Sequence, residues 1–211
     1  MANVAVQSAE TAHGRSFYPM NSNYFGQKSS INKGAHTMDY THHYISPLGG
    51  ITMASDGKYL TGLWFDGQKY FADTLNAQHE EKDLDVFRRT DNWLDIYFSG
   101  KKPNFTPTLR MKGTEFRQEV WQILLTIPFG KTMTYGAIAK ILAARRGTDA
   151  MSAQAVGGAV GHNPISLIIP CHRVVGTNGA LTGYAGGLEK KAWLLDMESQ
   201  SSVIFTTNAF E

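Results

Sequence analysis

The chain has 211 residues, of which 42% are hydrophobic, and this supports a folded core of one large or two small domains. Its net charge of +2 excludes a polybasic tail protein. Its one cysteine excludes an intrachain disulfide and a cysteine-rich zinc or iron–sulfur site. No apolar run reaches the roughly 18 residues that span a bilayer, and no signal-peptide pattern is visible, so we expect a cytoplasmic protein without a membrane contact.

The first 37 residues are rich in Ser, Asn, Gly and Ala and show little apolar periodicity. This composition predicts that residues 1–37 form a disordered extension, with Met38 as an alternative start. A short N-terminal strand that leaves no pattern in the sequence is the alternative.

Strands and one helix are predicted for residues 38–107, which makes this segment a small α/β domain. Between residues 40 and 71 the pattern predicts strands, including a hairpin in which Asp56-Gly57 joins two apolar runs. Apolar residues at helical spacing then predict a helix over 83–98.

A second, mainly helical domain is predicted for residues 108–200, because prolines mark a linker before Thr108, and residues 201–211 are expected to be a tail. Four helices are predicted, over 114–127, 135–144, 152–161 and 188–199. Thr114 and Thr134 are the expected N-caps of the first two. Between the last two helices, the apolar run Ile165–Ile169 predicts a short buried strand.

Cys171 and its neighbours Pro170, His172 and Arg173 form the sharpest motif. A thiolate is a soft nucleophile, and an adjacent basic group raises the thiolate fraction. Neighbours in a regular strand point to opposite faces, so His172 can act on Cys171 only if the backbone turns there or through a bridging water. A buried structural cysteine beside a surface histidine is the alternative.

The stretches around this motif are distinctive. Residues 161–176 read GHNPISLIIPCHRVVG, residues 181–188 read LTGYAGGL, and residues 191–195 read KAWLL. Together they closely resemble the O6-alkylguanine-DNA alkyltransferase family, the methylated-DNA–protein-cysteine methyltransferases. The resemblance runs from about residue 42 to 199 and is strongest from Phe116 onward.

The resemblance implies an α/β N-terminal domain and a helical C-terminal domain with a winged helix-turn-helix-like DNA-binding fold. It also implies direct-reversal DNA repair, in which a methyl or other alkyl group moves from guanine O6, and from thymine O4, to a buried cysteine of the protein. The alkylated cysteine is a thioether, which has no easy leaving group, so the cysteine is not regenerated. A chain with one cysteine therefore reacts once. The target lies inside a base stack, so the base must be flipped into a pocket.

Carried over by position, the resemblance makes Cys171 the alkyl acceptor, His172 its water-linked base and Glu198 the acid that polarises His172. Asn163 is expected to organise the turn before the active-site segment. Tyr135 is expected to meet the flipped base and is a candidate acid for the departing guanine. Without the resemblance, the alternative for Glu198 is a solvated acid at a helix end.

The pocket and the DNA contact are assigned in the same way. The residues expected to line or support the guanine pocket are Val160, Val174, Tyr184, Ala185 and Lys191. The residues expected to contact DNA are Ala153, Gln154, Ala155, Gly157, Gly161 and Arg173. The helix over 152–161 has few side chains that read base edges, and its small residues allow close approach of its backbone to DNA. A tightly packed internal helix is the alternative.

This chain departs from the family pattern at two places. Many members carry an arginine where this chain has Gln154, and an amide lacks the charge that would aid base flipping. Some members bind zinc through cysteines of the first domain, which has none here, and His42-His43 is expected to be a solvated pair rather than a metal site. We therefore expect no metal, no cofactor, a monomer, and duplex DNA containing O6-alkylguanine as the partner.

Four other functions compete with this interpretation. A non-catalytic sensor or regulator of alkylated DNA on the same scaffold would need no nucleophilic cysteine. A helix-turn-helix regulator would need an effector domain, which is not recognisable. A cysteine hydrolase would need an oxyanion hole, and an S-adenosylmethionine methyltransferase would need a strand followed by a Gly-x-Gly loop; the sequence carries no signal for either.

Overall fold

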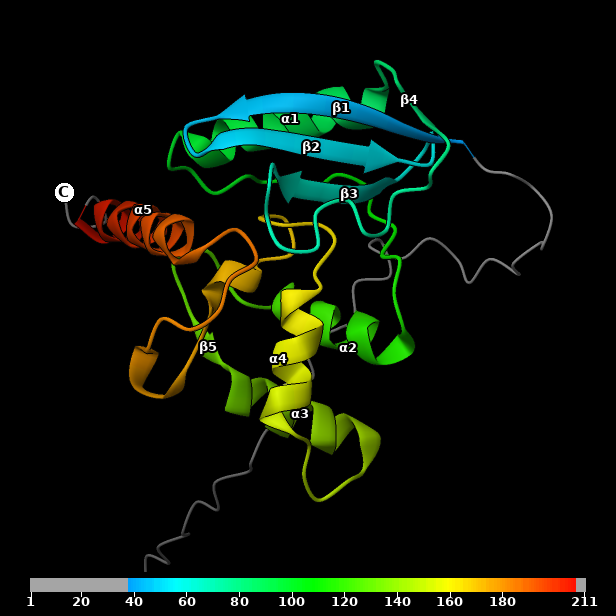
Figure 1. The fold of residues 1–211 in the computed structure, drawn as a ribbon. Coiled ribbons are helices and arrows are strands. Elements are labelled where there is room, and N and C mark those ends of the chain that lie inside the picture. The colour runs from blue at the N-terminus through cyan, green and yellow to red at the C-terminus, as the bar shows by residue number, and fades with distance from the viewer. Residues whose placement is uncertain (1–37, 208–211) are drawn as a thin grey trace, which may run out of the picture.

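The computed structural model describes residues 38–207 of the chain, with side chains up to residue 200. The expected extension over residues 1–37 and the end of the expected tail lie outside the described residues. A sheet with one helix forms the first half of the described chain, and the remaining helices gather below it (Figure 1). The predicted fold class, an α/β N-terminal part followed by a mainly helical C-terminal part, is confirmed.

The sheet has four strands in the order β3-β2-β1-β4. Their bounds are β1 (Asp39–Ser46), β2 (Gly49–Ser55), β3 (Leu60–Phe65) and β4 (His79–Glu81). The first three pair antiparallel, and β4 pairs parallel to β1. The predicted hairpin turn joins β2 and β3, where Gly57 has a φ of 96°, a conformation that glycine adopts without strain.

The stretch of strands predicted between residues 40 and 71 ends earlier than predicted. β3 ends at Phe65, and a loop follows in which Tyr70 and Ala72 have φ angles of 60° and 54°. Left-handed backbone at two positions turns the chain away from the sheet. This loop reaches the functional site described below.

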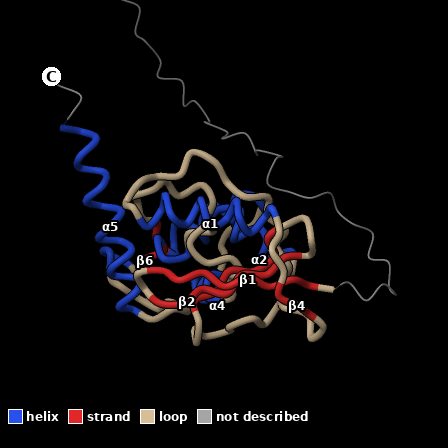
Figure 2. The backbone as a smooth tube through the Cα atoms, turned by 90° about the horizontal axis from the view of Figure 1, so that it is seen from above, coloured by secondary structure: helices blue, strands red, loops and turns tan. Residues whose placement is uncertain are grey.

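Helix α1 (Asp85–Phe98) lies along one face of the sheet (Figure 2). Its buried face includes Phe87, Trp93, Leu94 and Tyr97. Burial of such large side chains stabilises the fold by about 1.5–3 kcal/mol each. Tyr97 brings a phenol hydroxyl into this buried layer.

Strand β3 joins the two halves. The backbone amide of Leu63 donates to Pro164 O over 2.8 Å, and Ser166 N donates to Leu63 O over 2.8 Å. Leu60 pairs in the same way with the linker, donating to Thr108 O and accepting from Arg110 N. The edge of the sheet is thus covered by chain from the second half, which holds the segment before Cys171 against the first.

The second half contains α2 (Glu115–Leu124), α3 (Tyr135–Arg146), α4 (Ala153–Gly161) and α5 (Leu188–Thr207). The predicted N-caps are confirmed: Thr114 Oγ1 accepts from Arg117 N over 3.3 Å, and Thr134 Oγ1 accepts from Ala137 N over 3.1 Å. Two-residue strands β5 (Met133–Thr134) and β6 (Val174–Val175) pair in parallel. Helix α5 extends past the predicted end at Ser199. None of the helices within residues 38–207 has the length and apolar character to cross a membrane.

The strand predicted for Ile165–Ile169 is absent. Ile165 makes a single bridge to Leu63, and the chain then turns at Leu167, whose φ is 67°. The run is apolar because it is buried on all sides, not because it pairs in a sheet. Its turns deliver Cys171 to a short 3₁₀ helix, Cys171–Arg173.

Candidate active site

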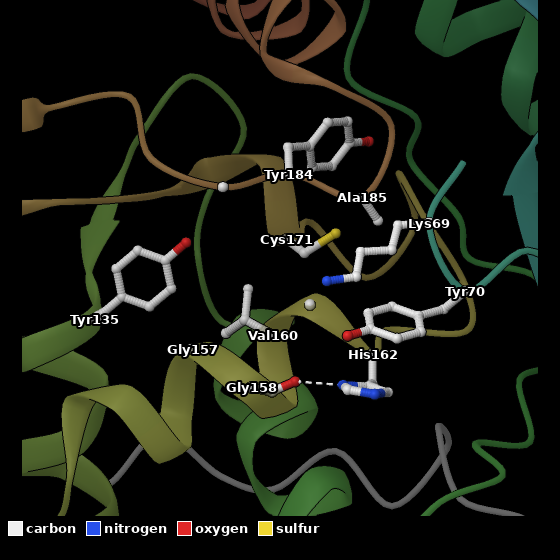
Figure 3. Close-up of a pocket in the computed structure, with 12 residues that line it drawn as sticks. Lys69, Tyr70, Tyr135, Gly157, Gly158, Val160, His162, Cys171, Tyr184 and Ala185 are labelled. Carbon is white, nitrogen blue, oxygen red and sulfur yellow. Dashed lines mark hydrogen bonds between the residues drawn. The ribbon is translucent and has the colours of Figure 1, made fainter. Parts of the chain in front are cut away.

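A cavity of about 310 Å³ lies between the two halves of the chain, and Cys171 is part of its lining (Figure 3). The thiol side chain is 5% exposed. The other lining residues come from α3, α4, the loop after β6 and the loop after β3. They include Tyr135, Val160, Tyr184, Ala185, Lys69 and Tyr70.

Asn163 holds both the turn and the sulfur of Cys171. Its Nδ2 donates to Cys171 Sγ over 3.1 Å and to Ile169 O over 2.8 Å, while its Oδ1 accepts from Ile165 N over 3.0 Å. Burial raises the pKa of the Cys171 thiol, while the Asn163 hydrogen bond and the charge of Lys191 oppose that rise. The resting group is therefore a thiol, which needs a base to become a nucleophile.

Glu198 reaches the active-site turn from α5 and binds both residues that follow Cys171. Its Oε1 lies 2.8 Å from His172 Nε2. Arg173 donates from Nε to Oε2 over 2.8 Å and from Nη2 to Oε1 over 3.0 Å. Burial alone would raise the pKa of Glu198, but His172 and Arg173 hold it well below its usual range. Glu198 is therefore an ionised carboxylate in the interior, neutralised by Arg173.

Two further donors complete this cluster. The Tyr97 hydroxyl donates to Glu198 Oε1 over 2.7 Å, and the backbone amide of Gly130 donates to Oε2 over 3.0 Å. Burial and the Glu198 charge raise the pKa of Tyr97 well above its usual value, so the phenol keeps its proton. The cluster thus joins α1, α5 and the 3₁₀ helix around one carboxylate.

This geometry fixes the proton on the His172 ring. An ionised carboxylate only accepts hydrogen bonds, so Nε2 of His172 must carry the hydrogen of its bond to Glu198. The proton of the Tyr97 hydroxyl is already donated to the same oxygen and is not needed by Nε2. Burial lowers the pKa of His172, so the ring is neutral. Its Nδ1 is then the bare nitrogen, and it is buried without a hydrogen-bond partner among the described residues. An unprotonated, unpartnered nitrogen next to Cys171 in the chain is available as a base.

The wall of the cavity opposite α4 is formed by the loop after β6. Lys191 is buried and donates from Nζ to Val174 O and Thr182 O, each over 2.6 Å. It thereby ties β6 to the loop that carries Tyr184 and Ala185, which line the cavity. Lys191 and Val174 do not line it themselves, so both support the pocket from behind.

Helix α4 contributes one long face to the site. Val160 and the glycines Gly157, Gly158 and Gly161 line the cavity. A Cβ added at Gly158 or Gly161 would meet no atom within 4 Å, so packing within this chain does not require glycine there. The alternative of a tightly packed internal helix therefore does not account for these residues.

The first turn of α4 is exposed, including Ala153, Gln154 and Ala155. Residues three and four apart lie on the same side of a helix, so Gln154 lies one turn from Gly157 and Gly158, at the edge of the cavity. Ser152 caps this turn by accepting from Ala155 N over 3.2 Å.

Arg173 is a correction to the sequence analysis, which placed it at the DNA contact. It is 8% exposed and, besides Glu198, it donates from Nη1 to Ile127 O over 2.8 Å. A guanidinium held in this way has no free face toward a DNA backbone. Its role is to stabilise the buried carboxylate.

In the histidine pair of the first domain, His43 is exposed as expected, whereas His42 is half-buried. His42 Nε2 lies 3.0 Å from Asp91 Oδ2, whereas His43 Nε2 lies 2.8 Å from Asp66 Oδ2. Neighbours on a strand point to opposite faces, and each finds a different carboxylate. Among the described residues, no three His, Cys, Asp or Glu side chains lie together as a metal site would need.

Several residues of the site were not predicted from the sequence, among them Tyr97, Lys69, Tyr70 and His162. Tyr97 lies in the predicted helix over 83–98, and a phenol on an apolar helix face is a signal for a buried partner. Lys69, Tyr70 and His162 are brought together by tertiary contact, and no spacing in the sequence indicates it. Tyr70 and His162 stack with ring centroids 3.9 Å apart.

Comparison with protein families gives two matches that together span most of the described chain. Residues 40–111 match the family model of the 6-O-methylguanine DNA methyltransferase ribonuclease-like domain. Residues 115–200 match the model of the 6-O-methylguanine DNA methyltransferase DNA binding domain.

Curated relatives agree with these matches. The methylated-DNA–protein-cysteine methyltransferase of Mycobacterium tuberculosis H37Rv is 43% identical over 153 residues, which cover 72% of this chain and 88% of that protein. The protein of the same name from Methanosarcina mazei is 44% identical over 162 residues, which cover 77% of this chain and 98% of the relative.

Solved structures show the same fold. The crystal structure of M. tuberculosis OGT in complex with DNA aligns with a TM-score of 0.66 at 40% identity, covering 78% of this chain and 94% of that one. An O6-methylguanine DNA methyltransferase from Methanococcus jannaschii aligns with a TM-score of 0.50 at 31% identity, covering 71% and 88%.

Proposed function

Since the chain belongs to the 6-O-methylguanine DNA methyltransferase family, we propose that it repairs O6-alkylguanine in duplex DNA by moving the alkyl group onto Cys171. The activity is that of a methylated-DNA–protein-cysteine methyltransferase, and the repair is direct reversal of the damage. O4-methylthymine is part of the proposed substrate range, because the same transfer from oxygen to sulfur applies. The alkyl donor is the lesion itself, so the reaction as proposed uses no cofactor.

The observation that carries the proposal is the thiol of Cys171 in the cavity, bonded to Asn163 and followed in the chain by a histidine with a bare Nδ1. A sensor of alkylated DNA would need the cavity but neither the nucleophile nor the buried His172–Glu198 pair. The non-catalytic alternative is therefore not favoured.

In the proposed mechanism, His172 Nδ1 takes the thiol proton through a water molecule. Glu198 stabilises the imidazolium that forms, because its charge lies against Nε2. The thiolate attacks the alkyl carbon, a C–S bond forms, and the C–O6 bond breaks. The guanine leaves as an anion and must gain a proton.

Tyr135 is the proposed donor of that proton. It lines the cavity across from Tyr70 (Figure 3), and burial raises its pKa, so its phenol is protonated at neutral pH. A phenol that keeps its proton at neutral pH still has one to give when the guanine anion forms. The ring of Tyr184 supplies a flat surface for the flipped base.

DNA is expected to approach along the exposed first turn of α4. Gln154 lies one turn from the cavity, a position from which its side chain can enter the space that a flipped guanine leaves. The protein is proposed to act as a monomer in the cytoplasm, a reducing compartment that keeps the single cysteine as a thiol.

The test is intact-mass analysis after incubation with a duplex containing O6-methylguanine. We expect the mass of the protein to rise by one methyl group per chain, on the peptide that contains Cys171, and transfer to stop there. Cys171→Ser should show no gain, while a control duplex with unmodified guanine should leave the wild type unchanged. Turnover beyond one methyl per chain, or methylation of another residue, would contradict the proposal.

A further inference from the structure

The loop after β3 forms part of the wall of the cavity, although it belongs to the first half of the chain. Lys69 N donates to Ala185 O over 3.0 Å, which ties this loop to the opposite wall. The next residue, Tyr70, stacks on His162 at the end of α4. The backbone of Lys69 is therefore fixed at the pocket by its own bond to Ala185 and by the stacking of the next residue, Tyr70, on His162.

The side chain of Lys69 brings a positive charge into this cavity. Its ammonium group points into the cavity that also receives the sulfur of Cys171 (Figure 3). Its nitrogen lies 4.8 Å from the centroid of the Tyr70 ring. The cavity lining contains no carboxylate, and no ion pair joins Lys69 to an acid in the described part of the chain.

This arrangement bears on which O6 substituents the site can accept. The carbon to be transferred must lie against Cys171 Sγ, because the C–S bond forms there. Any atoms beyond that carbon project into the remaining space of the cavity, into which the Lys69 ammonium group also points. A methyl group cannot use an ammonium group, whereas a carboxylate can accept a charge-assisted hydrogen bond from it.

We propose that Lys69 forms a subsite for a negatively charged O6 substituent, and that this one side chain sets how well the chain accepts guanines whose O6 group ends in a carboxylate relative to O6-methylguanine. O6-carboxymethylguanine is the smallest lesion of this class. The inference rests on the proposed function, since it needs transfer to Cys171. It makes Lys69 a specificity-determining residue, not a catalytic one.

The transfer is chemically balanced in the same way as methyl transfer. The Cys171 thiolate attacks the CH₂ carbon, the C–S bond forms and the C–O6 bond breaks. The guanine anion takes a proton, and the product is S-carboxymethylcysteine with its carboxylate unchanged. Lys69 neutralises the carboxylate, which would otherwise repel the incoming thiolate.

The experiment compares single-turnover transfer from O6-carboxymethylguanine and O6-methylguanine in the same duplex sequence. Wild type, Lys69→Met and Lys69→Arg are measured, with Lys58→Met as a matched control because Lys58 is exposed and does not line the cavity. The quantity compared is the ratio of the carboxymethyl rate to the methyl rate. A variant that folds less well lowers both rates, so the ratio stays informative.

We expect Lys69→Met to lower this ratio about three- to tenfold, the size of a charge-assisted bond in a partly open site, and Lys69→Arg and Lys58→Met to keep it. A second pair of substrates, free O6-benzylguanine with and without a carboxylate on its ring, removes the DNA phosphates. The same fall in the ratio is expected there.

Three results would overturn the inference. An unchanged ratio in Lys69→Met would mean that the charge does not contact the substituent. If Lys69→Met lowers the transfer rate equally for both duplex lesions and does not lower it for the free bases, then Lys69 contacts the DNA backbone and not the substituent. Methyl transfer without any carboxymethyl transfer by the wild type would refute the subsite alone, whereas no methyl transfer at all would refute the proposed function as well.

Discussion

Gly158 allows the roles of α4 in folding and in repair to be separated by one substitution, Gly158→Ala. Gly158 is exposed, lies within the helix and lines the cavity, and its added Cβ would meet no atom within 4 Å. Alanine in a helix is more favourable than glycine by about 0.5–1 kcal/mol, so the free energy of unfolding should rise by that amount. For a domain of this size, each kcal/mol corresponds to about 2–4 °C in Tm.

The same methyl group should harm repair. It would project into the cavity at the place where a flipped nucleotide must approach the helix backbone, and a displacement of about 1 Å from the reacting geometry costs up to about a hundredfold in rate. We expect Gly158→Ala to melt at a higher temperature and yet transfer methyl at least about tenfold more slowly from a duplex lesion. Stability and activity thus change in opposite directions.

The measurements are thermal unfolding and single-turnover transfer on the same preparations. Gly136→Ala is the matched control: it lies in α3, does not line the cavity, and its Cβ would come no closer than 4.0 Å to Thr134 Oγ1. It should gain stability and keep its rate. If Gly158→Ala melts at a lower temperature, or repairs DNA at the wild-type rate, the assignment of α4 as a close-approach surface is wrong.

Three further predictions concern the buried network and the edge of the pocket. Glu198→Gln should lower the free energy of unfolding at pH 7 by about 3–5 kcal/mol, because Arg173 loses its buried counter-charge. The pKa of Glu198 is depressed in the folded state, so this stabilisation is complete above the unfolded pKa of about 4.3 and is lost as the pH falls below it. Denaturant titrations at pH 7 and pH 3 measure the free energy of unfolding of wild type and variant. The same difference between the two proteins at both pH values would contradict the assignment. Asn163→Ala removes the donor to Cys171 Sγ, so the pKa of the thiol should rise and the pH–rate profile of methyl transfer should move to higher pH; an unmoved midpoint would show that this bond does not tune the thiol. Gln154→Ala should slow repair in a duplex much more than transfer from free O6-benzylguanine, and Gln154→Arg should bind DNA more tightly with a steeper salt dependence; equal losses on both substrates would assign Gln154 to stability instead of base flipping.

The helix caps and the hairpin turn could be predicted from the sequence, because each depends only on a few neighbouring residues. Thr114 and Thr134 cap their helices because a hydroxyl three residues before a free amide is sufficient to form the bond. The Asp56-Gly57 turn is equally local. The run Ile165–Ile169 was misinterpreted because a buried loop and a buried strand have the same apolar composition, and only the left-handed backbone at Leu167 distinguishes them.

The candidate site was predicted best where the family motif covers it and least where the two halves meet. Asn163 donates to Cys171 Sγ, and Glu198 binds His172, the residue after Cys171; their roles in the transfer are part of the proposal. Arg173 was assigned to the surface because a sequence does not show whether a charge has an internal partner. Lys69 lies more than one hundred positions from Cys171 in the chain, and only the folded contact between β3 and the second half brings them to one cavity.

Glu198 follows the other members of its cluster in the chain, and this order has a consequence for synthesis. Its carboxylate joins Tyr97, His172 and Gly130, which leave the ribosome before it does. Until α5 is made and docked, Arg173 has no buried counter-charge, and His172 has no acid to support a positive charge. In the proposed mechanism, a chain that stops before Glu198 therefore lacks the acid that supports His172. A protein that reacts once would in this way keep Cys171 unspent until α5 has been made and has docked.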